Sequence, residues 1–220
     1  MVGRAAIPPP ALDMRLAEGL PAPVAGVDEA GRGPWAGPLV AAAVVLAAEA
    51  VPEGLDDSKR LSARRRAALA AMLEDLAGAG QAAIGLGIVE AAEIDRIGLG
   101  PANDAAMCRA VSSLGPGALG RPAALVLDGR RVPPALNLPA RAIVGGDGKV
   151  SAIAAASILA KVTRDRLMDA LDARHPGYGW ATNRGYGTAE HAAALARLGP
   201  TPEHRRCFRP VARIATERAV

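Results

Sequence analysis

The sequence contains few aromatic residues, few cysteines and no long hydrophobic run. Aromatic side chains make up only 2% of the 220 residues, so a core must be built from Leu, Val, Ile and Ala. Two cysteines, Cys108 and Cys207, are too few for a disulfide framework or a zinc cluster, which favours a reducing compartment. No run reaches the roughly 18 apolar residues that a membrane span needs. We therefore expect a cytoplasmic protein with no membrane contact.

The N-terminus, the length and the net charge set further limits. Residues 1–22 contain three consecutive prolines and no hydrophobic segment typical of a signal peptide, so they are predicted to be a loose tail. The rest fits one domain with an appendage, which we place at residues 23–173 and 174–220. The net charge of +4 permits a nucleic-acid partner but does not require one.

The most informative stretch begins with two adjacent acids, Asp28 and Glu29, and continues with Gly31-Arg32-Gly33. Consecutive side chains of a strand point to opposite faces, so both acids can serve one site only if the strand ends or bulges at Glu29. The following glycines favour such a turn and would let a ligand approach the backbone, with Arg32 beside it to meet a phosphate. A hairpin turn with two solvated acids explains the same residues, and the stretch alone does not decide between the two interpretations.

Hydrophobic periodicity predicts a mixed sheet packed against helices. The expected strands lie at residues 23–27, 39–46, 82–89, 124–129 and 141–144, with a hairpin between the first two. The expected helices run from a Ser62 cap to about residue 77, through residues 107–114, from 151 to about 173, and from 189 to 198. Strands that alternate with helices after an opening hairpin indicate an α/β domain.

Three strand ends or strand-to-loop junctions carry acids: Asp28-Glu29, Asp128 and Asp147. Sites in open α/β sheets gather at strand ends, so these side chains could meet in one cleft. Four unpaired carboxylates in one place repel one another and would need divalent cations. Two Mg²⁺ or Mn²⁺ ions roughly 4 Å apart would clamp the attacking water and the leaving oxygen of a phosphodiester. The Asp-Gly pairs at 128 and 147 also fit simple turns.

Several stretches, in the same order along residues 22–212, resemble the bacterial ribonuclease HII family. The resemblance is carried by GVDEAGRG at 26–33, DSK at 57–59, LDG at 127–129, AAASILAKVTRDR at 154–166, GYGT at 185–188 and HRRCF at 204–208. It implies a ribonuclease H-like mixed five-stranded sheet flanked by helices, with a helical C-terminal appendage over the substrate cleft. It also implies cleavage of the RNA strand of RNA–DNA hybrids, and incision 5′ of ribonucleotides embedded in duplex DNA that leaves 3′-hydroxyl and 5′-phosphate ends.

The resemblance also assigns roles to individual residues. The four metal-binding acids of the family fall on Asp28, Glu29, Asp128 and Asp147. The triplet Gly31-Arg32-Gly33 matches a loop that grips the 2′-hydroxyl through its backbone, and the 2′-hydroxyl alone distinguishes RNA from DNA at one position. Tyr186 matches a tyrosine that stacks under the sugar next to the scissile junction. The remaining substrate contacts are expected at phosphates, from Lys59, Ser157 and Lys161. The family more often has Ser where this chain has Cys207, which we interpret as tolerated packing.

Other conspicuous residues have structural interpretations. Asp165 follows Lys161 by four residues, which favours a helix salt bridge over a metal ligand. The histidines at 175, 191 and 204 lack metal-ligand spacing and are interpreted as surface or hydrogen-bonded structural residues. Both tryptophans are expected to pack inside the protein.

Three functions are compared on these grounds. The leading hypothesis is a two-metal endoribonuclease that acts as a monomer. The second is a non-catalytic nucleic-acid-binding module, which the four acids argue against because acids repel phosphates. The third is a nuclease of the same superfamily that acts on DNA alone, which the Gly31-Arg32-Gly33 loop and Tyr186 argue against.

Overall fold

A five-stranded mixed sheet forms the centre of the protein, whose computed structural model describes residues 14–115 and 117–217. The strand order is β3-β2-β1-β4-β5, with antiparallel pairing from β3 to β1 and parallel pairing from β1 to β5. The strands are β1 (Val24–Ala30), β2 (Leu39–Leu46), β3 (Ala82–Val89), β4 (Ala124–Asp128) and β5 (Ala140–Ile143). The predicted opening hairpin and mixed sheet are therefore confirmed.

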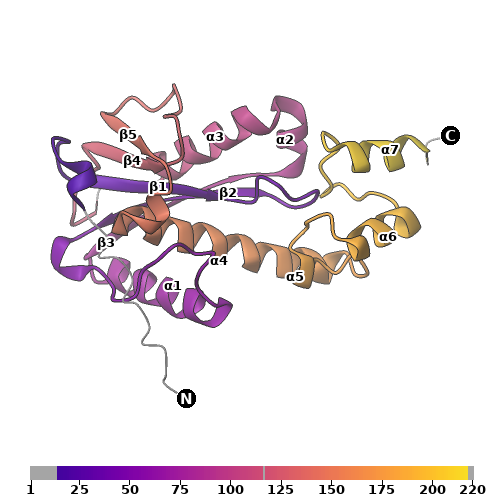
Figure 1. Cartoon of the computed structure of the whole chain (residues 1–220), viewed down its shortest axis with the longest axis horizontal. Coiled ribbons are helices and arrows are strands. Elements are labelled where there is room, and N and C mark those ends of the chain that lie inside the picture. The colour runs from indigo at the N-terminus through magenta and orange to yellow at the C-terminus, as the bar shows by residue number, and fades with distance from the viewer. Residues whose placement is uncertain (1–13, 116, 218–220) are drawn as a thin grey trace, which may run out of the picture.

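Helices cover both faces of the sheet (Figure 1). One face packs against α2 (Ala91–Ile97) and α3 (Leu99–Ser112), and the other packs against α1 (Ala63–Gly78) and α4 (Ser151–Arg174). Ser62 caps α1 as predicted, because its side chain accepts a hydrogen bond from the backbone N–H of Arg65. The buried residues of both layers are Ala, Val, Leu, Ile and one Met, as the low aromatic content requires.

Gly26 lets α4 approach the sheet closely enough to place the acids. A methyl group on Gly26 would lie 2.1 Å from the backbone carbonyl carbon of Ala152, near the start of α4. Any side chain at this position would push α4 away from β1. The 3-10 turn η3 (Gly146–Gly148) immediately precedes α4, so this close contact also holds η3 against the ends of β1 and β4.

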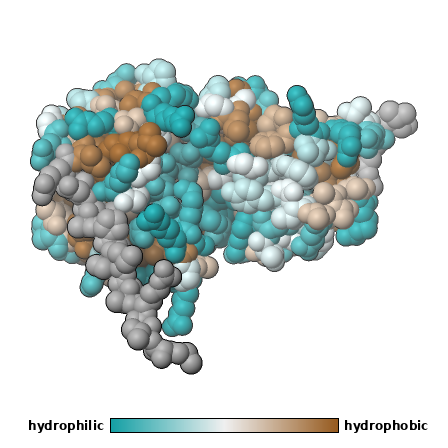
Figure 2. Space-filling view, viewed as in Figure 1, coloured by the Kyte–Doolittle hydropathy of each residue, from teal (hydrophilic) through white to brown (hydrophobic). Residues whose placement is uncertain are grey.

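The C-terminal segment lies at the far end of α4 and packs against the loop between β1 and β2 (Figure 1). It contains α5 (Trp180–Asn183), α6 (Ala189–Leu198) and α7 (Arg209–Glu217), of which only α6 was predicted. Ala36 forms an isolated bridge with His204, and the backbone N–H of Arg205 donates to the carbonyl of Trp35. Figure 2 shows mainly hydrophilic side chains in the region between the helix-covered sheet and this segment.

Two predictions about the N-terminal half are wrong in detail. The expected end or bulge of β1 at Glu29 is absent, because regular pairing with β2 continues through Glu29 and Ala30. The loose tail was placed at residues 1–22, but η1 (Met14–Ala17) is ordered, and Ala17 is buried against Val126 and Ile143. Residues 1–13 lie outside the described part of the chain. Short elements that the pattern did not predict are η1, η2 (Ala48–Ala50), η3, α5 and α7.

Candidate active site

Three aspartates meet at the ends of the central parallel strands. Asp28 ends the buried part of β1, Asp128 is the last residue of β4, and Asp147 lies in η3. The register pairs Val27 with Leu127, so Asp28 and Asp128 are the next neighbours across the two strands. One carboxylate oxygen from each aspartate lies within 4.8 Å of the others, and Asp28 and Asp147 are each only 4% exposed.

Local hydrogen bonds hold these carboxylates in place without neutralising them. Asp28 accepts from the backbone N–H of Glu29 at 2.7 Å, and Asp128 accepts from that of Gly146 at 2.7 Å. Burial raises the pKa of Asp28 well above its usual range, and the charges of Glu29 and Asp128 raise it further. Burial also raises the pKa of Asp147, although Lys59 acts in the opposite direction. The cluster therefore carries excess negative charge that a divalent cation would neutralise.

Glu29 occupies the opposite face of β1 from Asp28. Because β1 stays regular, Asp28 faces α4 while Glu29 faces the layer that contains α3. Glu29 nevertheless adjoins the cluster, since its pKa is raised first by burial and also by the charge of Asp128, against the lowering effect of Arg32. Arg32 lies 3.5 Å from the Glu29 carboxylate. The structure thus brings three of the four predicted acids together and places the fourth beside Asp128.

A cleft of about 300 Å³ opens beside the acids and is lined by every predicted substrate residue. These residues come from four parts of the chain, namely the loop after β1, the loop before α1, helix α4 and the segment after α5. They are Gly31, Arg32, Gly33, Lys59, Ser157, Lys161 and Tyr186. Residues far apart in the sequence therefore face one space, as the resemblance implied.

The two lysines and the serine already have partners within the protein. Lys59 donates to Asp147 at 3.0 Å while its side chain remains 77% exposed. Partial burial lowers the pKa of Lys59, but the bond to Asp147 and the nearby carboxylates outweigh it and raise the pKa. Lys161 donates to Asp165 at 2.7 Å, so the predicted salt bridge is confirmed. The buried Ser157 hydroxyl donates to Ser58 at 2.8 Å, which makes it more a support for the cleft wall than an exposed contact.

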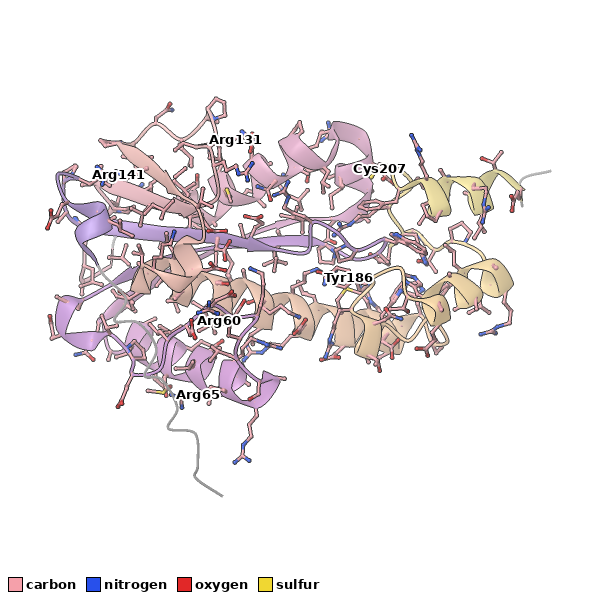
Figure 3. The ribbon with its side chains drawn as sticks, viewed as in Figure 1. Arg60, Arg65, Arg131, Arg141, Tyr186 and Cys207 are labelled. Carbon is pink, nitrogen blue, oxygen red and sulfur yellow. The ribbon has the colours of Figure 1, made fainter. Side chains whose placement is uncertain are left out.

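The glycine loop lies directly against Tyr186. A methyl group on Gly33 would lie 3.4 Å from Cε1 of Tyr186, whose side chain is 49% exposed at the cleft. Figure 3 shows Tyr186 between the sheet and the C-terminal helices. Gly31 has a φ of +96°, which favours glycine, and a methyl group there would lie 2.2 Å from Nε of Arg164. The loop conformation at Gly31 therefore depends on the absence of a side chain.

Two buried arginines that sequence reasoning missed hold this loop in place. Arg164 donates to the carbonyls of Ala36, Pro38 and Arg184, and Arg205 donates to those of Arg32 and Gly37. They are only 1% and 0% exposed, and burial lowers their pKa to about 10 and about 9. Both fall inside the motifs quoted above, but an isolated arginine in a sequence usually indicates a solvated surface.

The remaining interpretations concern structural residues, and the structure supports those of Trp180, His191 and His204. Trp180 is fully buried, and its ring N–H donates to His191 at 3.1 Å. His191 contacts His204 at 3.2 Å, so these two histidines are hydrogen-bonded structural residues. Cys207 was interpreted as tolerated packing, but it is exposed; its backbone N–H donates to Asp95 of α2, and it does not line the cleft of the acids. Among the described residues, no helix is both long and apolar enough to cross a membrane.

Buried carboxylates at the ends of neighbouring parallel strands, facing a cleft with lysines, are typical of enzymes that hydrolyse phosphodiesters with bound divalent metal ions. The sequence model of the family described as Ribonuclease HII matches residues 25–211. A ribonuclease HII of Rhizorhabdus wittichii is 50% identical over 206 residues, which cover 94% of this chain and 96% of the relative. A ribonuclease HII of Parvibaculum lavamentivorans is 53% identical over 203 residues, or 92% of this chain and 72% of the relative.

A solved structure gives the same result for the fold. The ribonuclease H2 of Pyrococcus horikoshii superposes with a TM-score of 0.70 at 27% identity, covering 88% of this chain and 97% of the other. This chain belongs to the ribonuclease HII family and is a metal-dependent ribonuclease with a ribonuclease H fold.

Proposed function

We propose that the protein cleaves the RNA strand of RNA–DNA hybrids and incises duplex DNA on the 5′ side of embedded ribonucleotides, leaving 3′-hydroxyl and 5′-phosphate ends. The observation that carries the proposal is that Gly33 and Tyr186 line the same cleft as the acids, so close together that a methyl group added to Gly33 would lie 3.4 Å from Cε1 of Tyr186. Because Gly33 has no side chain, its peptide group and the ring of Tyr186 leave a narrow slot for a sugar next to the scissile phosphate.

The four acids fit a divalent metal site. The carboxylates of Asp28, Asp128 and Asp147 lie within 4.8 Å of one another, burial raises the pKa of Asp28 and Asp147, and Lys59 is the one cation among the described residues that donates to them. Asp28, Glu29, Asp128 and Asp147 would hold two Mg²⁺ or Mn²⁺ ions. Such ions supply Lewis-acid activation of water and charge stabilisation of the leaving oxygen.

The other cleft residues bind and orient the strand. The peptide groups of Gly31 and Gly33 hydrogen-bond the 2′-hydroxyl, which is both donor and acceptor, while Arg32 and Lys161 face the phosphates. Tyr186 packs under the sugar that follows the ribonucleotide and excludes bulkier groups there. Lys59 opposes the burial that raises the pKa of Asp147, and it is exposed enough to reach a phosphate as well.

Residues 23–173 act as the catalytic domain, and residues 174–220 cover the cleft through Tyr186. All four acids, the glycine loop and Tyr186 come from one chain, so one copy supplies a complete site. We therefore propose that the protein acts as a monomer, which equilibrium sedimentation with and without substrate would test.

The decisive assay incubates the protein and Mg²⁺ or Mn²⁺ with a labelled DNA duplex that contains one ribonucleotide. An all-DNA duplex serves as control. We expect one cut 5′ of the ribonucleotide, products with 3′-hydroxyl and 5′-phosphate ends, and no cleavage of the control. A 2′,3′-cyclic phosphate product would refute the proposal, because it requires the 2′-hydroxyl as the nucleophile. Equal cleavage of the control would support a nuclease that acts on DNA alone.

The role of Tyr186 is tested by comparing Tyr186→Phe and Tyr186→Ala on the same duplex and on a long RNA–DNA hybrid. The phenylalanine variant keeps the ring and should retain most of its kcat/KM. The alanine variant loses the stacking surface and should lose activity on the single ribonucleotide most severely, by about tenfold to a hundredfold. An alanine variant that cuts the single-ribonucleotide duplex as fast as wild type would show that Tyr186 does not sense the junction.

A further inference from the structure

A second hollow lies on the other side of Glu29 and Asp128 from the substrate cleft. Its volume is about 130 Å³, and Glu29, Arg32 and Asp128 line both this hollow and the cleft. The other walls come from residues 100–107 of α3 and from residues 129–133 of the loop after β4. Because β1 is regular, Glu29 faces this side of the sheet, so the two hollows meet at the carboxylates.

The three arginines of the second hollow differ in their partners. Arg131 makes a bidentate ion pair with Asp104, with distances of 2.6 and 3.0 Å, which fastens the loop after β4 to α3. Figure 3 shows Arg131 beside α3. Arg32 lies 3.5 Å from Glu29. Arg130 is exposed and has no hydrogen bond or ion pair to any residue that the structure describes. Its guanidinium is therefore available to a ligand.

The net charge of this hollow depends on whether Glu29 and Asp128 bind cations. Three arginines face three carboxylates there, those of Glu29, Asp104 and Asp128, so the hollow is formally neutral by itself. Cations bound to Glu29 and Asp128 would neutralise two of these carboxylates. The arginines would then outnumber the remaining acid Asp104, and the hollow would attract an anion.

We propose that the second hollow binds a phosphodiester of the cleaved strand on the 5′ side of the scissile bond, with Arg130 as its principal contact. The inference rests on the proposed function, in which the ribonucleotide and the sugar after it lie in the cleft against Gly33 and Tyr186. The strand on the 5′ side must leave the acids in the direction away from Tyr186. The second hollow adjoins the acids, is not lined by Tyr186, and would carry the net positive charge of its arginines once cations occupied Glu29 and Asp128.

The test couples the protein variant Arg130→Gln with a neutral linkage in the substrate. Duplexes with one ribonucleotide carry a single uncharged methylphosphonate at the first, second or third phosphate on the 5′ side of the scissile one, or at matching 3′ positions. Affinity is measured by fluorescence anisotropy in Ca²⁺, and single-turnover cleavage is measured in Mg²⁺. The matched control is Arg121→Gln, because Arg121 is also exposed but precedes β4, at the end of the strand opposite to the acids.

We expect one 5′ methylphosphonate to weaken wild-type binding by roughly tenfold, as the loss of a charge-assisted hydrogen bond does. Arg130→Gln should bind the unmodified duplex about tenfold more weakly, and the same methylphosphonate should not weaken its binding further. The salt dependence of its binding should correspond to about one phosphate contact fewer than in wild type. Arg121→Gln should behave as wild type. The inference would be overturned if methylphosphonates at all three 5′ positions weakened binding by Arg130→Gln as much as by wild type. It would also be overturned if the variant lost sensitivity only to a methylphosphonate at a 3′ position. Failure of the proposed function itself would appear separately, as wild type that leaves the unmodified duplex uncut.

Discussion

The acid cluster and the pair of buried arginines, Arg164 and Arg205, both adjoin the loop that follows β1, and each brings together groups of like charge. The carboxylates of Asp28, Asp128 and Asp147 accept few hydrogen bonds, and burial raises the pKa of Asp28 and Asp147. Neither Arg164 nor Arg205 forms a salt bridge with any carboxylate in the described part of the chain, but each donates to two or more backbone carbonyls.

The acid cluster is therefore suited to bind cations, whereas the two arginines stabilise the fold. The arginine charges are delocalised and meet carbonyl dipoles of the loop between β1 and β2, so they stabilise one loop conformation. The carboxylates repel one another and so destabilise the metal-free protein. Bound cations would relieve this repulsion, and a phosphate could then bind to the cations. Removing a charge should therefore have opposite effects on stability in the two regions.

The largest expected effect is that of Asp128→Asn on catalysis. The substitution keeps the acceptor for the backbone N–H of Gly146 and removes one of the clustered charges, so kcat should fall by at least about 10³-fold. Duplex binding should be as tight as in wild type or tighter, and the melting temperature of the metal-free protein should not fall. Single-turnover cleavage, anisotropy and calorimetry measure the three quantities.

Asp165→Asn is the control for this substitution, because Asp165 is paired with Lys161 outside the cluster. It should retain substantial activity. Equal and complete loss of cleavage in both variants, with both proteins folded, would show that Asp165 also acts in the site.

The opposite effect on stability is expected for Arg205→Met. The carbonyls of Arg32 and Gly37 would lose their donor inside the protein, so the free energy of unfolding should fall by about 3 kcal/mol. Urea denaturation measures this value. Arg109→Met is a matched control, since Arg109 also links separate elements through Glu93 and the carbonyl of Ile88, but at an exposed position. That substitution should cost about 1 kcal/mol or less. An Arg205→Met protein as stable as wild type would show that Arg205 does not stabilise the loop between β1 and β2.

Titration should also distinguish the two regions. Burial, together with the charges of His191 and His175, lowers the pKa of His204 to about 3, whereas an unfolded histidine titrates near pH 6.5. Between these values the unfolded state binds a proton that the folded state does not, so His204 makes stability fall as the pH falls below about 6.5. Asp28 and Asp147 change stability with pH in the opposite direction. Their pKa values are raised in the folded protein, so acidification from neutral pH favours the folded state.

The His204 contribution is isolated by comparing unfolding free energies of wild type and His204→Asn between pH 7 and pH 5. The difference between the two proteins should change by about 2 kcal/mol over this range. A difference independent of pH would show that His204 titrates normally in the folded protein.

The sequence predicted the positions of the clustered acids better than the role of the two buried arginines. The ends of β1 and β4 are marked by apolar runs followed by acids, and hydrophobic periodicity located the five strands and the long helix α4 within a few residues. The regular continuation of β1 through Glu29 was not predicted, because the glycines that follow suggested a bulge. Pairing with β2 decides that geometry, and local sequence does not contain it.

The C-terminal segment was predicted less well because its elements are short and its contacts are distant in sequence. At 4 residues α5 is too short for periodicity to be informative, whereas α7 was missed although Val211 and Ile214 form its buried face. Arg205 bonds to Gly37, 168 positions away, and Asp95 accepts from the backbone of Arg206 and Cys207. A charged residue in a loop gives no local signal of such burial.

The smallest expected effect, that of Gly33→Ala, tests whether the two regions meet at the substrate. Gly33 belongs to the loop next to the acids, and Tyr186 belongs to the C-terminal segment that the arginines hold. An added methyl group would lie 3.4 Å from Cε1 of Tyr186, an ordinary contact, so the protein should fold with wild-type stability. The slot for the sugar would be narrower, and kcat/KM on a single-ribonucleotide duplex should fall by roughly tenfold, with a smaller loss on long RNA–DNA hybrids.

Gly31→Ala provides the contrast, because a methyl group there would lie 2.2 Å from Nε of Arg164 and the φ of +96° disfavours alanine. That variant should lose stability and should be impaired on both substrates alike. Comparing kcat/KM on the two substrates with melting temperature separates a narrowed slot from a displaced loop. If Gly33→Ala keeps wild-type kcat/KM on both substrates, the sugar does not pass between the loop and Tyr186, and the C-terminal segment only covers the cleft.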